Sequence, residues 1–130
     1  MKHLLLILFT IFCFGCEKET KIDGIQFPKT ELANTTWKRF SFKAVVSRED
    51  VYEFLHFTNA NTVEMYSADI DGKNIINGKR VYPYKLTLSK RNIDSFEVFY
   101  PNGKSEMGGT TQDVNVIVFG IGDYKYDRVP

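Results

Sequence analysis

The stretch VYPYKLTLS, residues 81–89, alternates between bulky and mostly smaller or polar side chains. Successive side chains of an extended strand point to opposite faces, so every second residue shares a face. The bulky set consists of Tyr82, Tyr84, Leu86 and Leu88. Pro83 has no backbone N–H and therefore predicts an edge position or a bulge within the strand. The stretch is typical of a β-strand with one buried face.

Seven further segments have strand character and are separated by short turn signals. They cover residues 36–46, 51–58, 62–70, 93–100, 104–111, 113–119 and 123–129, and residues 71–80 form the longest predicted loop. In the first of them, Phe40 and Phe42 share a face. We therefore expect an all-β domain. We expect either an antiparallel up-and-down eight-stranded barrel or a strongly curled open sheet. Closing into a barrel would leave no unpaired edge strand.

The composition indicates one globular domain. A chain of 130 residues with 43% hydrophobic and 15% aromatic residues can fill one core. Lys and Arg number 17 against 16 Asp and Glu, and without Lys2 the two signs are equal in number. A neutral domain has no electrostatic surface for nucleic acid, so we expect no nucleic-acid partner.

The N-terminus has the three parts of an export signal. Lys2 and His3 precede an apolar stretch, residues 4–14, and Gly15 precedes Cys16. The apolar stretch is shorter than the roughly 20 residues that a membrane-spanning helix needs, and charged residues follow it. We therefore interpret residues 1–15 as a helical signal peptide.

Cys13 and Cys16 have the spacing of a redox pair. A redox pair lies at the start of a helix in a folded unit, whereas both cysteines here end a signal sequence. A zinc site would need further ligands, and His56 is the only histidine after the signal. Neither reading fits, and a processing signal is the better interpretation.

A small residue directly before a cysteine, after an apolar run, resembles the lipobox of bacterial lipoproteins. The resemblance implies that Cys16 is lipidated and becomes the first residue of the mature chain. Ordinary signal cleavage after Gly15 is the alternative, at the same bond. Either reading implies export, and lipidation implies a cell-envelope, outer-membrane lipoprotein that faces the periplasm or the surface, held to the membrane by the lipid on Cys16. The charged residues after Cys16 resemble surface-export signals of some Bacteroidetes lipoproteins.

Residues 16–31 are polar and aperiodic, so we interpret them as a tether and residues 32–130 as the folded domain. LANTTWKRF (residues 32–40) and DYKYDRV (residues 123–129) resemble the small lipocalin-like domains of bacterial lipoproteins. The wider lipocalin and fatty-acid-binding-protein group places a Trp on the first strand and a cation on the last, which pack across one end of the barrel. Trp37 and Arg128 stand in those positions. Because Trp37 lies on the opposite parity from Phe40 and Phe42, either a bulge intervenes or the Trp caps the barrel end.

The aromatic residues of the strands have two interpretations. They line a ligand cavity, or they fill the core, since an eight-stranded barrel is only just wide enough for its own side chains or one small ligand. The candidate ligand-lining residues are Phe40, Phe42, Tyr82, Tyr84, Phe96, Tyr124 and Tyr126. The leading hypothesis is a binding module for a small apolar or amphipathic ligand. The alternative is a solid barrel that contacts another envelope protein through residues 71–80 and 101–109.

The sequence shows no catalytic constellation. His56 is a lone histidine, no G-x-S-x-G motif is present, and no free thiol follows Cys16. Asp69-Ile-Asp71-Gly72 resembles the opening of a calcium loop, but the required Gly and Glu are replaced by Asn74 and Arg80. We therefore expect no enzyme, no cofactor and no metal site.

Overall fold

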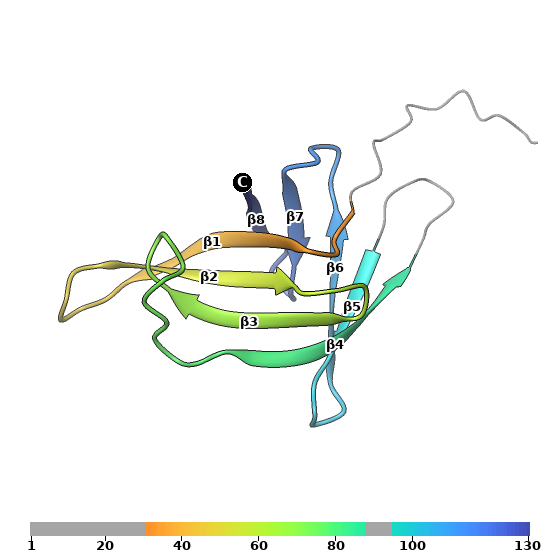
Figure 1. Cartoon of the computed structure of the whole chain (residues 1–130), viewed down its shortest axis with the longest axis horizontal. Helices are drawn as coiled ribbons and strands as arrows, with labels where there is room; N and C mark the ends of the chain where they lie inside the picture. The colour runs from red at the N-terminus through yellow and green to blue at the C-terminus, as the bar shows by residue number, and fades with distance from the viewer. Residues whose placement is uncertain (1–30, 88–94) are drawn as a thin grey trace, which may run out of the picture.

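Figure 1 shows the computed structural model, which describes residues 31–87 and 95–130. The expected signal peptide (1–15), Cys16 and all but the last residue of the expected tether lie outside the described residues. Over the described ranges, the regular elements are β-strands. No helix in this part of the chain is long and apolar enough to cross a membrane.

Eight strands follow one another along the chain. They are β1 (Thr35–Lys43), β2 (Asp50–Phe57), β3 (Thr62–Ala68), β4 (Arg80–Thr87), β5 (Ser95–Phe99), β6 (Ser105–Thr110), β7 (Val116–Phe119) and β8 (Tyr124–Val129). Each strand pairs antiparallel with the next, and β8 pairs with β1. The predicted up-and-down eight-stranded barrel is confirmed, in its closed form. Pro83 is not on a sheet edge: it is the last residue of β4 that pairs with β3, and pairing with β5 begins at Tyr84.

The barrel has two halves that cross each other. In Figure 1, β1 to β4 run side by side across the view, and β5 to β8 run at a steep angle to them. The ladders that join the halves are short. Residues 36–38 of β1 pair with residues 127–129 of β8, and residues 84–87 of β4 pair with residues 95–98 of β5. Beyond these pairs the strands diverge, at what we call the β1–β8 wedge and the β4–β5 wedge.

A β-bulge changes the direction of the side chains of β1. The register between β1 and β2 shifts between Phe40 and Phe42, with Phe40 opposite Tyr52 and Phe42 opposite Val51. Residues opposite each other share a face, so the extra residue places the two phenylalanines on opposite faces. The expectation that they share a face is wrong. The bulge lies between Phe40 and Phe42, so it brings Phe42 to the face of Trp37, while Phe40 stays on the opposite face.

Large apolar side chains fill one end of the barrel. Phe57 and Phe96 are fully buried, with their ring centroids 5.3 Å apart, and Phe96 stacks on Phe119 at 5.6 Å. Tyr84 meets Phe57 edge to face at 4.9 Å. These four rings form a packed core with no room for a ligand among them.

Trp37 and Arg128 lie opposite each other where β1 and β8 pair. The Arg128 guanidinium lies 5.7 Å from the centroid of the Trp37 ring, and the ring is fully buried. The indole N–H donates to Thr35 Oγ1 at 2.7 Å. Asn34 has a φ of 61°, a conformation that Asn tolerates, and it turns the chain into β1. The pair that the sequence predicted at the barrel end is therefore in contact.

Candidate binding cavity

A cavity of about 310 Å³ occupies the part of the barrel where the strands diverge. It lies toward the start of β2 and the end of β3, away from the core around Phe57. Its walls come from β2, β3, β4, β8, the loop before β4 and Tyr100, the residue that follows β5. The lining residues are Glu53, Phe54, Leu55, Met65, Tyr66, Ser67, Asn77, Gly78, Arg80, Tyr82, Tyr100 and Tyr126.

The inner wall of the cavity is apolar. Leu55 is 1% exposed and belongs to the core, and Met65, Tyr82 and Tyr100 pack against that core. The Tyr82 and Tyr100 rings meet edge to face, with centroids 4.9 Å apart, beside the β4–β5 wedge. Such a wall removes an apolar group from water.

Arg39 and Glu53 close the β1–β8 wedge with a network of polar contacts. Glu53 Oε2 accepts from Arg39 Nε at 2.8 Å and from the Tyr126 hydroxyl at 3.1 Å, and lies 2.6 Å from an Arg39 terminal nitrogen. Glu53 Oε1 accepts from the Ser41 hydroxyl at 3.2 Å. The Arg39 guanidinium also lies 4.1 Å from the centroid of the Tyr124 ring. Both carboxylate oxygens of Glu53 are thus engaged, and its charge is matched by Arg39.

Two tyrosines of the cavity, Tyr100 and Tyr126, are held in their neutral form. Burial raises the pKa of Tyr126 to about 12, and the nearby Glu53 charge adds to this effect, while Arg39 opposes it. Burial also raises the pKa of Tyr100, whose hydroxyl donates to Glu106 Oε2 at 2.7 Å. Both hydroxyls therefore remain hydrogen-bond donors over the physiological pH range.

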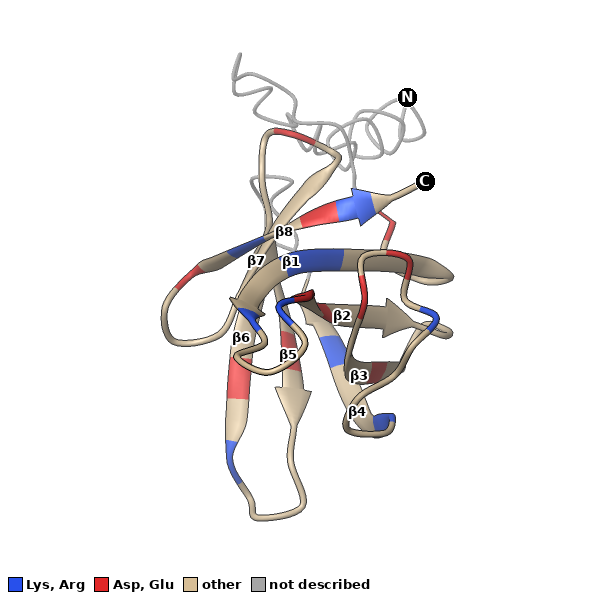
Figure 2. Ribbon diagram, turned by 90° about the vertical axis from the view of Figure 1, so that its left-hand side faces the viewer, with Lys and Arg blue, Asp and Glu red and all other residues tan. Residues whose placement is uncertain are grey.

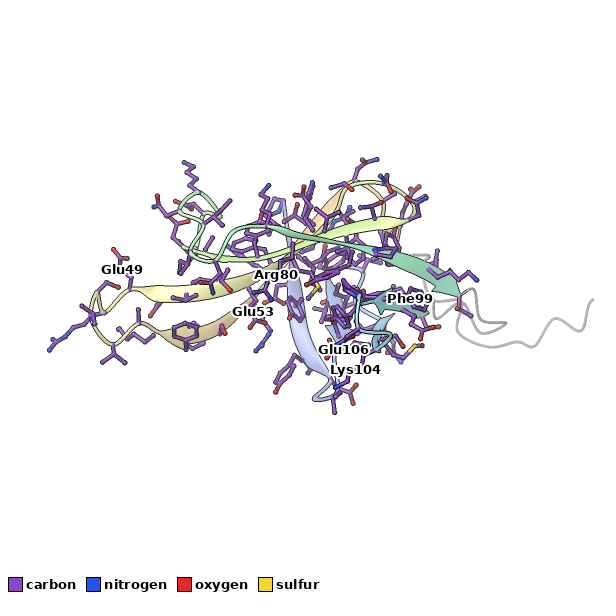
Figure 3. The ribbon with its side chains drawn as sticks, turned by 90° about the horizontal axis from the view of Figure 1, so that it is seen from below. Glu49, Glu53, Arg80, Phe99, Lys104 and Glu106 are labelled. Atoms are coloured by element: carbon purple, nitrogen blue, oxygen red, sulfur yellow. The ribbon has the colours of Figure 1, made fainter. Side chains whose placement is uncertain are left out.

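Arg80 lines the same cavity at the β4–β5 wedge. It shares the parity of Tyr82 and Tyr84 on β4 and lies opposite Met65 of β3, so it belongs to the inward-facing set. Among residues 31–87 and 95–130, no side chain forms an ion pair with it. Figure 3 shows Arg80 and Glu53 over the middle of the molecule, far from Glu49 at the tip of the β1–β2 hairpin.

The structure divides the seven predicted lining residues. Tyr82 and Tyr126 line the cavity, whereas Tyr84 and Phe96 are buried in the core. The remaining three do not line it: Phe40, Phe42 and Tyr124 are 52%, 53% and 50% exposed. Phe40 lies on the face of β1 opposite that of Trp37, Phe42 lies beyond the last pairs with β8, and the Tyr124 ring lies against the Arg39 guanidinium.

Several lining or supporting residues were missed in the sequence. They are Arg39, Glu53, Met65 and Arg80. The available signal was strand parity, because Arg39 follows Trp37 by two positions and Arg80 precedes Tyr82 by two. A charged residue in the inward register of a barrel strand indicates a polar interior.

The other polar candidates have local structural roles. The His56 ring nitrogen Nδ1 lies 2.8 Å from the Thr36 hydroxyl, opposite it on β1. The Asp69 carboxylate accepts from the backbone N–H groups of Lys73 and Asn74, at 2.8 and 3.2 Å, and from the Asn74 side chain. Within the described part of the chain, no three His, Cys, Asp or Glu side chains gather as metal ligands would.

Charged residues of both signs are interspersed over the strands. Figure 2 shows Lys and Arg beside Asp and Glu along the ribbon, with no face of one sign in that view. Comparison of the chain with protein-family models, with curated proteins and with solved structures gives no match. The cavity is therefore the feature from which a function can be argued.

Proposed function

We propose that the protein is a non-enzymatic binding module that holds one small amphipathic ligand in the open part of a lipocalin-like barrel. The observation that carries the proposal is the cavity of about 310 Å³, with Leu55 and Met65 on its inner wall and Glu53, Arg80 and Tyr126 around it. Ligand sites are commonly apolar cavities with a few placed polar groups.

The size of the cavity limits the ligand. Binding pockets for small molecules are roughly 300–1,000 Å³, so this cavity is at the lower end of that range. An engineered apolar cavity of about 150 Å³ takes up benzene. A volume about twice as large fits a ring with a short chain, and the packed core around Phe57 and Phe96 prevents a long acyl chain from passing through.

Two methionines provide a direct test of occupancy. Met65 lines the cavity, whereas Met107 is 54% exposed on the outside of β6. With methyl-labelled methionine in the purified full chain, addition of phenylbutanol should shift the Met65 methyl signal and leave that of Met107 unchanged. We expect a dissociation constant of about 0.1–1 mM, since small ligands gain a few tenths of a kcal/mol per atom.

A cavity-filling variant supplies the control. Because the Met65→Trp substitution removes the Met65 methyl group, binding to the variants is followed by titration calorimetry. Met65→Trp should abolish phenylbutanol binding because the larger ring occupies the space, whereas Met107→Trp should bind as the wild-type protein does. If both methyl signals move equally, or if Met65→Trp binds unchanged, the ligand is outside the cavity and the proposal fails.

The cellular location is a separate part of the proposal. The lipobox-like sequence ending at Cys16 supports export and lipid anchoring in the cell envelope. The Cys16→Ala variant should no longer incorporate labelled fatty acid, while a Cys13→Ala variant should still do so. Equal labelling of both variants would contradict the assignment.

A further inference from the structure

The two inward-facing arginines of the open part of the barrel differ in their partners. Arg39, at the β1–β8 wedge, is bound by Glu53 and covered by the rings of Tyr124 and Tyr126. Arg80, at the β4–β5 wedge, has no ion pair and no hydrogen bond from its side chain among the residues that the structure describes. One wedge is closed by an internal ion pair, and the other carries an unmatched charge.

Neighbouring acids do not supply the missing partner. Glu53 lines the same cavity, but both of its oxygens are engaged by Arg39, Tyr126 and Ser41. Glu106 accepts a hydrogen bond from the Tyr100 hydroxyl, and it does not line the cavity.

Lys79, the residue before Arg80, does have an acidic partner. Lys79 forms an ion pair with Glu64 at 3.1 Å and lies 5.0 Å from the centroid of the Tyr66 ring. Lys43 likewise has Asp50 at 3.9 Å. Other exposed cations of the described residues, such as Lys85 and Lys104, also form no ion pair, and Arg80 differs from them because it lines the cavity.

We propose that the ligand of this cavity carries an oxyanion, a carboxylate or a phosphate, which binds the Arg80 guanidinium while its apolar body lies against Leu55 and Met65. The inference rests on the proposed function and names the ligand class. A guanidinium presents a rigid fork of donors that matches both oxyanions, and its weak hydration suits the mouth of an apolar cavity. A cationic ligand has no free carboxylate to meet, because Glu53 is already neutralised by Arg39.

Four probes with the same apolar body separate the charge from the rest of the ligand. They are phenylbutanol, phenylbutyrate, phenylbutyl phosphate and phenylbutylamine, titrated against the full chain with the Met65 methyl signal as the readout. We expect at least one of the two acids to bind about tenfold more tightly than the alcohol, because a charge-assisted hydrogen bond is worth more than a neutral one. The two acids also decide between carboxylate and phosphate. The amine should bind no better than the alcohol.

Variants of adjacent residues assign the effect. Arg80→Gln should bring both acids to within about twofold of the alcohol when all three are titrated against that variant, and Arg80→Lys should keep part of the preference. Lys79→Gln removes the adjacent positive charge, which is paired with Glu64, and this variant should keep the full preference for the acids. Because Arg80 is exposed, its substitution should not unfold the barrel.

The outcomes distinguish this inference from the proposed function. If the alcohol and the acids bind equally, the cavity is a ligand site but its ligand is not an anion. If Arg80→Gln keeps the preference for the acids, Arg80 does not bind the oxyanion and the inference fails. If the amine binds best, the ligand is not an anion. If none of the four probes shifts Met65, the proposed function itself fails, and the inference about Arg80 fails with it.

Discussion

The ring of Phe96 lies directly over the backbone of Gly108, so closely that a β-carbon on Gly108 would be 2.2 Å from Phe96 Cζ. The two residues are opposite each other on β5 and β6. Because Gly108 has no side chain, the ring can lie over the neighbouring strand and stack on Phe119. The packing of the filled end thus depends on the absence of a side chain at Gly108.

Gly108→Ala should destabilise the protein by about 1–3 kcal/mol, since the methyl group must displace a fully buried ring from its position. Urea unfolding followed by circular dichroism measures the change. Met107→Ala, at an exposed neighbouring position, should change the free energy of unfolding by less than about 0.5 kcal/mol. Equal effects of the two variants would show that the contact with Phe96 is unimportant.

Replacing Arg128 tests the cation–π contact with Trp37. Arg128→Met keeps most of the apolar stem and removes the charge, so the free energy of unfolding should fall by about 0.5–1 kcal/mol. Lys125→Met, on the opposite face of β8 and exposed, is the matched control and should be nearly neutral. The contact contributes nothing if both variants unfold at the same urea concentration.

The network at the β1–β8 wedge should contribute more than an ordinary surface ion pair. Glu53→Gln removes the negative charge that accepts hydrogen bonds from Arg39, Tyr126 and Ser41. The free energy of unfolding should fall by about 1–2 kcal/mol, and no more than that because the Glu53 side chain is 36% exposed and solvent screens its charge. Lys43→Gln breaks the exposed pair with Asp50 and should cost less than about 0.5 kcal/mol. A result in which both substitutions cost the same would argue against a cooperative network.

Alkaline pH should destabilise the protein through Tyr126. The pKa of Tyr126 is about 12 in the folded state, against 10.0 for an ordinary tyrosine. The unfolded state therefore loses this proton first, and the free energy of unfolding falls as the pH rises from about 10 to about 12. Denaturation at several pH values measures the slope. Tyr126→Phe should have a shallower slope in this window, and an unchanged slope would exclude Tyr126 as its source.

The strand order could be predicted from the sequence because alternation and turn residues are local properties. The eight strands and their up-and-down succession follow from segments such as residues 81–89, which alternate clearly. The faces of β1 could not be predicted beyond Phe40, because the bulge depends on pairing with β2 and leaves no local signal. Phe40 and Phe42 were assigned to one face for this reason.

The cavity was the least predictable feature. It exists because the ladders between β1 and β8 and between β4 and β5 end early, and ladder lengths depend on how the whole sheet closes. Tyr82 and Tyr126 could be named as lining residues from parity and size, whereas Arg80 was noticed only as the residue that a calcium loop would not contain. Strand parity applied to charged residues would have identified Arg39 and Arg80.

The closure of the barrel through residues 36–38 and 127–129 also determines how the domain can be handled. The described chain enters the barrel next to Thr35 and leaves it after Val129, and both points belong to the end that Trp37 and Phe57 fill. The cavity lies toward the opposite ends of β2 and β3. A surface, a label or a fusion partner attached at the C-terminus therefore leaves the entrance beside Arg80 accessible, so the domain can be immobilised through that terminus for ligand screening.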